Sequence, residues 1–221
     1  KYSDSPSRRN HSMNLIDNIL DKITMYRLVL YFLLLLSLFG LFLKPTLIYI
    51  FYGVLVVLIS WLTNTIFAKI VKTPTNVESV YISALILILV VDPSINIIWL
   101  AIVTQASKYL LAINKKHIFN PVAIALVIFG PASWWIVTIW TVPIILIGGL
   151  LITYKLRRFQ MMIAFFTASL LAFYFSKISV YGFVAYSPLL FFAFIMLTEP
   201  QTSPTVKFMQ IIYGSGVGIL Y

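Results

Sequence analysis

The chain has 221 residues, of which 61% are hydrophobic and only 10% are charged, and its mean hydropathy is +1.00. A water-soluble domain of this length needs far more charge to cover its surface, so we expect the outside of the fold to face lipid. The 16 Lys and Arg residues outnumber the 6 Asp and Glu residues, but they lie in short clusters between apolar runs. That placement is typical of membrane topology signals and argues against nucleic-acid binding.

The N-terminal residues are predicted to lie outside the bilayer. Residues 1–13 are polar and rich in Ser and Arg, which predicts a disordered cytoplasmic tail. Residues 14–26 predict an amphipathic helix lying on the cytoplasmic surface of the membrane. Its apolar side chains share one helical face: Leu15, Ile16, Ile19, Leu20 and Ile23.

Apolar runs follow, separated by charged residues, Pro or Gly. They predict membrane segments at 27–43, 46–68, 79–91, 94–113, 119–130, 133–154, 159–176, 180–197 and 207 onward. The third and fifth runs are short for the ~20 residues that a crossing helix needs, so we expect half-spans or tilted helices there. The class predicted for 27–221 is therefore all-α, a polytopic membrane bundle that shows nine spans of an expected ten, with the last beyond Tyr221.

The cations give a test of this segmentation. With the N-terminus in the cytoplasm, thirteen of them fall in cytoplasmic loops or in the N-terminal region, and only Lys44 and Lys177 fall in outside loops. This positive-inside bias predicts a multi-pass protein of the cell (inner) membrane. An acidic residue followed by Pro ends both the third and the eighth run, at Asp92 and Glu199. These ends fall on opposite faces, which favours two inverted five-helix repeats.

Two polar loops stand out from this apolar background. In residues 114–121, Asn120 is a good helix cap and Pro121 suits the first turn of a helix. With the neighbouring lysines, this helix start predicts a site for an anion or a polar ring; the alternative is an ordinary capped helix. Residues 198–205 contain Glu199 between apolar runs, and they predict either the rim of a cavity or a plain connecting loop.

Stretches around these loops resemble the NqrB/RnfD family of membrane flavin subunits, found in the sodium-pumping NADH:quinone oxidoreductase and in the Rnf complex. Residues 116–123 resemble its N-x-F-N-P-A stretch, 198–204 its D-P-x-T-S-P loop, and 212–218 the helix that follows that loop. Ser107-Lys108-Tyr109 stands at the place of a small-residue/Lys stretch. The matches run in order over residues 75–221. The resemblance implies a ten-helix bundle of two inverted halves, similar to urea transporters.

The family carries one FMN esterified to a threonine of an S-G-A-T motif and a non-covalent flavin near the N-x-F-N-P loop. This chain has no S-G-A-T and passes through 129–135 directly into the next span. The resemblance therefore implies a non-covalent flavin only, either FMN or riboflavin. It also implies a cytoplasmic reductase domain or subunit with FAD and a 2Fe-2S cluster, expected downstream of Tyr221 if it is fused.

The implied function is electron transfer in a respiratory chain. As an oxidoreductase component, the chain would relay electrons from an NAD(P)H-oxidising reductase through its flavin to quinone or across the membrane. Asn120 and His117 are expected to bond the ring edge, and Lys116 or Lys108 to favour the reduced anion. From its position in the fourth run alone, Lys108 is expected to snorkel to the surface rather than to pair with a ligand. The full set of candidate cofactor-binding residues is Lys108, Lys116, His117, Phe119, Asn120, Glu199, Thr202 and Ser203.

Two alternatives remain from the sequence. One is a transporter or channel for a small polar solute on a urea-transporter-like scaffold. The other is a structural anchor for a reductase. The sequence predicts no metal site and no hydrolytic residue set, because it contains no cysteine and no recognisable catalytic motif.

Overall fold

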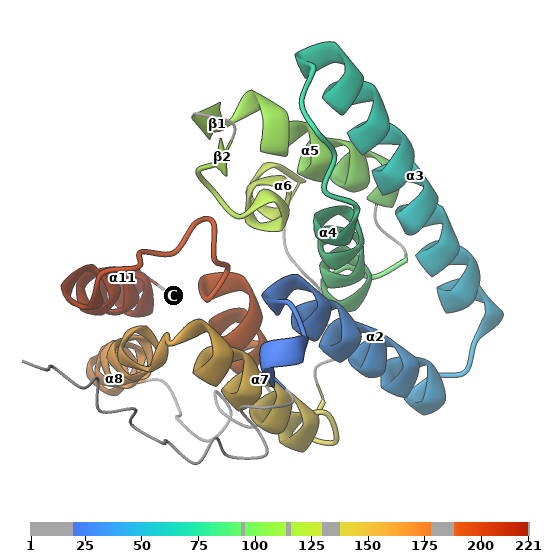
Figure 1. Ribbon diagram of the computed structural model, residues 1–221. Helices are drawn as coiled ribbons and strands as arrows, with labels where there is room; N and C mark the ends of the chain where they lie inside the picture. Colours follow the sequence, from blue (N-terminus) through green and yellow to red (C-terminus); the bar gives the residue numbers. More distant parts are fainter. Residues whose placement is uncertain (1–19, 94–95, 114–115, 130–137, 178–187, 221) are drawn as a thin grey trace, which may run out of the picture.

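The computed structural model describes residues 20–93, 96–113, 116–129, 138–177 and 188–220 (Figure 1). These residues are mostly helical, as predicted, and they include one short β-hairpin. The helices are α2 (Met25–Leu43), α3 (Leu47–Val71), α4 (Val77–Val90), α5 (Ile97–Leu110), α6 (Pro121–Phe129), α7 (Val142–Leu156), α8 (Phe159–Phe175), α10 (Leu189–Phe191), the π-helical η1 (Phe192–Leu197) and α11 (Lys207–Leu220). The strands are β1 (Ala112–Ile113) and β2 (Lys116–His117).

Two helices, α2 and α3, are long and apolar enough to cross a membrane, with 19 and 25 residues. Helices α4, α5, α7 and α8 are also apolar but have only 14 to 17 residues. At about 1.5 Å per residue they are roughly 21–26 Å long, which is shorter than the ~30 Å hydrocarbon core of a bilayer. Length and composition therefore support two candidate spans, and the predicted count of nine is not confirmed.

The observed boundaries correct some predicted ones. The predicted segment 94–113 is too long, because α5 ends at Leu110 and Ala112 pairs with His117 in the hairpin. The predicted interfacial helix also runs too far. Helical structure continues only to Lys22, and Thr24 then caps α2 by accepting a hydrogen bond from the Arg27 backbone N–H at 3.3 Å.

Several predictions concern residues outside the described ranges. They are the disordered tail at 1–13, most of the interfacial helix, and the first residues of the predicted segments 133–154 and 180–197. The other predicted segments coincide with helices that differ from them by a few residues at each end.

The helices form two groups that meet along α2 and α7 (Figure 1). In the first group, α3 packs against α4 and α5, α2 against α4, and α5 against α6. In the second group, α7 packs against η1 and α8 lies beside α11. Buried apolar side chains from both groups make one core, including Phe32, Leu36, Leu87, Ile145 and Phe191. This core fixes the ends of the helices that surround the cavity described below.

Helices α8 and α11 are in close contact because α11 presents glycines to its neighbour. A Cβ atom on Gly214 would lie 2.4 Å from the backbone oxygen of Met161, and one on Gly218 would lie 2.5 Å from that of Phe165. Backbone atoms cannot move aside as a flexible side chain can, so larger residues at these positions would force the two helices apart. Small residues at such contacts are a common device of membrane helix pairs.

Candidate functional site

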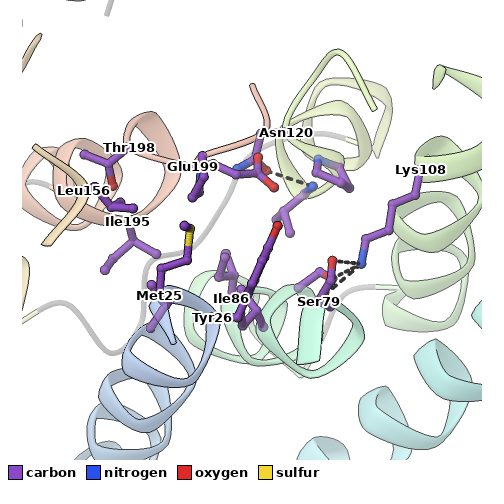
Figure 2. Close-up of a pocket in the computed structure, with 16 residues that line it drawn as sticks. Met25, Tyr26, Ser79, Ile86, Lys108, Asn120, Leu156, Ile195, Thr198 and Glu199 are labelled. Atoms are coloured by element: carbon purple, nitrogen blue, oxygen red, sulfur yellow. Dashed lines mark hydrogen bonds between the residues drawn. The ribbon is translucent and has the colours of Figure 1, made fainter. Parts of the chain in front are cut away.

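A cavity lies where six helix ends meet (Figure 2). The first turns of α2, α4 and α6 and the last turns of α5, α7 and η1 contribute to its lining. The space between its lining atoms is about 560 Å³ including open solvent, but the centre of a water-sized sphere can enter only about 40 Å³ of it, so a ligand larger than water must push the lining apart. Apolar side chains such as Val29, Ile82 and Ile86 line it together with a small polar group that includes Lys108, Asn120 and Glu199. A mainly apolar pocket with a few convergent polar groups is the usual form of a small-molecule site.

Lys108 reaches across from α5 to the first turns of α4. Its Nζ donates to the backbone oxygen of Ser79 at 2.8 Å, to Ser79 Oγ at 3.2 Å and to Ser83 Oγ at 2.6 Å. An ammonium has three protons, so these three acceptors use its full capacity. The side chain therefore points into the helix bundle, and the expectation that it snorkels to the surface is wrong.

Asn120 performs the capping role predicted from the sequence. Its Oδ1 accepts from the backbone N–H groups of Val122 at 3.0 Å and Ala123 at 3.2 Å, and Pro121 is the first residue of α6. Its Nδ2 also donates to the backbone oxygen of Met196 at 3.4 Å. Asn120 thus ties the start of α6 to η1 and keeps one amide proton for another acceptor.

Glu199 connects the two loops that carry the sequence motifs. Its Oε1 lies 2.9 Å from His117 Nε2, across 82 residues of sequence, and its Oε2 accepts from Thr202 Oγ1 at 3.2 Å. The His117 side chain is only 7% exposed. This link places the hairpin before α6 directly against the loop after η1, beside the cavity.

The loop 198–205 is held from two further sides. The guanidinium of Arg158, in the turn between α7 and α8, donates to the backbone oxygens of Pro204 and, at 3.3 Å, Ser203. Burial lowers the pKa of Arg158, because desolvation disfavours its charge. On the other side, Gln201 Nε2 donates to the Tyr26 hydroxyl of α2 at 2.8 Å. A non-helical segment between apolar helices thereby gains partners for its polar backbone, as such segments require.

The predicted site residues separate into three groups. Lys108, Asn120 and Glu199 line the cavity. His117 and Thr202 stand behind the lining and hold Glu199 in place.

The remaining three predicted residues belong to the hairpin and to the loops on either side of the cavity. Phe119 is 54% exposed and does not line the cavity. Lys116 lies in β2, opposite Ile113. Ser203 is buried, and its backbone N–H donates to the Glu199 backbone oxygen at 3.0 Å.

Sequence reasoning missed several residues of the site. Ser79 and Ser83 are the partners of Lys108, and only their spacing of four residues on α4 hinted at a shared face. Arg158 sits in a basic cluster that the positive-inside pattern already explains, so nothing in the sequence singles it out. Gln105 is fully buried on α5, and its Nε2 lies 3.4 Å from Ser83 Oγ. A glutamine inside an apolar run indicates a polar contact within the helix bundle, and this signal is present in the sequence.

A second pocket adjoins the cavity. It is lined by Asn64, Thr73, Tyr109 and His117, and it shares Lys108 and Ser79 with the cavity. Tyr109 donates to Asn64 Oδ1 at 2.8 Å on its wall. Both spaces therefore lie where α4 begins and α5 ends.

Comparisons with protein-family models, curated proteins and solved structures give no match for this chain. The site must therefore be interpreted from its own geometry and from the two sequence motifs that meet in it.

Proposed function

We propose that the chain is the membrane part of an electron-transfer system and holds a flavin non-covalently in the cavity. In this proposal it is a multi-pass protein of the cell membrane with nine spans, its N-terminus in the cytoplasm and two inverted repeats. A cytoplasmic reductase supplies the electrons, and quinone or a carrier across the membrane receives them. The NqrB/RnfD resemblance is the source of the cofactor assignment.

The observation that carries the proposal is the meeting of two distant motifs beside one cavity. Residues 116–123 and 198–204 are the stretches that resemble the flavin subunits, and His117 and Glu199 join them at 2.9 Å. The helix ends around the cavity also agree with the expected topology. Alternation of the spans puts the starts of α2, α4 and α6 and the ends of α5, α7 and η1 on the cytoplasmic side. A cytoplasmic reductase would meet the cavity there.

The donors and acceptors around the cavity suit the edge of an isoalloxazine ring. Lys108 is the cation among the described lining residues, and Asn120 has an amide proton to donate. The apolar side chains of α2 and α4 can cover the ring face. In the structure Lys108 and Glu199 are bonded to protein partners, so binding would exchange some of these bonds for bonds to the ligand.

A bound flavin would supply one- and two-electron chemistry. The residues of this chain would bind the ring, exclude water from its apolar face and place a positive charge beside it. Lys108 would favour the anionic reduced form by charge attraction. His117 and Thr202 would act as positioning residues for Glu199.

The test is a visible absorption spectrum of the full chain purified in detergent, before and after acid precipitation. A flavin band that moves to the supernatant is expected for a non-covalent site. A band that stays in the pellet would mean a covalent attachment. A colourless protein that takes up neither FMN nor riboflavin would overturn the proposal.

A small-solute transporter remains the second candidate, because the polar side chains Lys108 and Ser79 line two adjoining spaces. Transport needs a path through the whole bundle, whereas both of these spaces lie at one end of it. Electron transfer, which needs only a cofactor site, is therefore the function that the geometry supports better. Solute uptake into liposomes by a colourless protein would reverse this preference.

A further inference from the structure

A second cluster of charged side chains lies where α7 ends and α8 and α11 begin, at the ends that the proposed topology places in the cytoplasm. A pocket there, which we call the basic pocket, is lined by Leu20, Asp21, Tyr154, Lys155, Arg157, Phe159, Gln160 and Lys207. Three cations and one acid therefore face the same space. Anions are the ligands that such an excess of positive charge attracts.

The cations of the basic pocket differ in their partners. Lys155 Nζ donates to the backbone oxygen of Leu20 at 2.6 Å and lies 3.4 Å from Asp21 Oδ1. Within the described residues, neither Arg157 nor Lys207 has a carboxylate partner. Both are exposed, and Arg157 takes a left-handed backbone conformation, with φ 55°, at the end of α7. Among the described residues, two cations of the basic pocket thus have no acidic partner, and Asp21 is paired with Lys155.

An apolar groove continues from the basic pocket along α8 and α11, which lie side by side in Figure 1. Gln160 lines both spaces. Small side chains make room in the groove at Ala164, Ala168, Ala172 and Ser215, and Ile163, Leu171, Phe175, Ile211 and Ile219 border it. From Gln160 to Phe175 the groove follows α8 for roughly 22 Å, which exceeds the ~15 Å hydrocarbon depth of one leaflet.

We infer that the basic pocket and the α8–α11 groove together bind one anionic phospholipid. The phosphate would lie between Arg157 and Lys207, and an acyl chain would lie in the groove. Charge complementarity selects an anionic head group, and the continuous apolar groove selects a lipid over a free anion. Basic pockets between helices on the cytoplasmic side suit such head groups. The inference rests on the membrane placement proposed above, although it does not depend on the flavin.

The experiment is native mass spectrometry of the full chain in detergent, with phosphatidylglycerol or phosphatidylcholine added at equal concentration. We expect one phosphatidylglycerol to stay bound under activation that removes phosphatidylcholine. The double substitution Arg157→Gln/Lys207→Gln should weaken phosphatidylglycerol binding about tenfold or more, since each cation near the head group contributes about 1 kcal/mol. The matched control is Lys69→Gln/Lys72→Gln, which removes two exposed cations near the end of α3 and should leave binding unchanged.

The groove has its own test. Ala164→Phe fills it without changing any charge and should also release the lipid, whereas Leu170→Phe, on α8 but outside the groove, should not. Inorganic phosphate should give no thermal stabilisation comparable with that from phosphatidylglycerol.

Three results would overturn the inference. They are equal retention of the two lipids by the wild-type protein, wild-type phosphatidylglycerol binding in the Arg157/Lys207 variant, or equal stabilisation by phosphate. Flavin content measured on the same samples separates this inference from the proposed function. The head-group variant should keep its flavin, so a failed lipid experiment leaves the flavin proposal standing.

Discussion

The cavity and the basic pocket both contain lysine, but they differ in where the cations find their partners. Lys108 at the cavity donates three hydrogen bonds to α4, and Arg158 donates to two backbone oxygens of the loop 198–205. In the basic pocket, Arg157 and Lys207 have no carboxylate partner among the described residues.

Cations that cluster at a helix end can therefore serve two purposes. Cations with internal partners determine the positions of loops and helix ends, so their loss leaves buried acceptors unpaired. Cations without such partners are available to something outside the protein, and their loss costs the fold little. Arg157 and Arg158 are adjacent in sequence and fall on opposite sides of this division.

The largest expected effect comes from Arg158→Gln. The substitution removes the donors to the Ser203 and Pro204 carbonyls, and each unpaired buried acceptor costs about 1–3 kcal/mol. Thermal unfolding in detergent should show the loss. Arg157→Gln is the matched control and should stay within about 0.5 kcal/mol of the wild type. Equal destabilisation by the two variants would remove the distinction between the regions.

The next effect concerns the cavity cation. Lys108→Met keeps the length of the side chain but removes the charge and its three hydrogen bonds. The bound flavin would lose a hydrogen bond from a charged donor. Such a bond contributes about 1.5–3 kcal/mol, so flavin affinity should fall about tenfold or more. Titration of the stripped protein with FMN and riboflavin measures this. Unchanged affinity would place the flavin elsewhere.

A smaller effect is expected from Glu199→Gln. The amide can still accept from Thr202 or bond His117, so the loss is the difference between hydrogen bonds to a charged carboxylate and to a neutral amide, about 1 kcal/mol. The melting temperature should drop slightly. Glu199→Ala, which removes every side-chain bond to both partners, should lower it clearly more. If the two variants melt alike, the link between the two motif loops does not stabilise the site.

The smallest effect is expected from Lys207→Gln. The side chain is exposed and has no ion-pair partner among the described residues, so unfolding in phosphatidylcholine should change by less than about 0.5 kcal/mol. The stabilisation that phosphatidylglycerol adds should nevertheless shrink. A marked loss of stability without any anionic lipid would assign Lys207 to the fold.

Much of the helical fold could be predicted, because long apolar runs and capping residues are local signals. Asn120 and Pro121 fixed the start of α6, and the clusters of Lys and Arg separated the runs. The end of α5 could not be predicted, since Ala112 and Ile113 are apolar yet leave the helix for a hairpin. Hydropathy alone does not distinguish apolar residues that continue a helix from apolar residues that leave it for a hairpin.

The site was only partly predictable for a different reason. Local patterns identify the two motif loops, but they do not predict the bond between His117 and Glu199 or the turn of Lys108 toward Ser79 and Ser83. Such contacts depend on the packing of α4 against α5 and on the π-helical turn of η1, which sets the direction of the chain before Glu199. These are long-range features that no local pattern encodes.

The anchors of the loop 198–205 have a consequence for biosynthesis. Its partners are separated from it by 175 residues at Tyr26, by 82 at His117 and by 45 at Arg158. Because contacts of such sequence separation form slowly, and because ribosomes deliver the chain from its N-terminus, the cavity closes only when this late segment arrives. Chains halted before residue 198 would still lack one wall of the cavity, so under the proposed function a flavin should be loaded only after this loop has been synthesised.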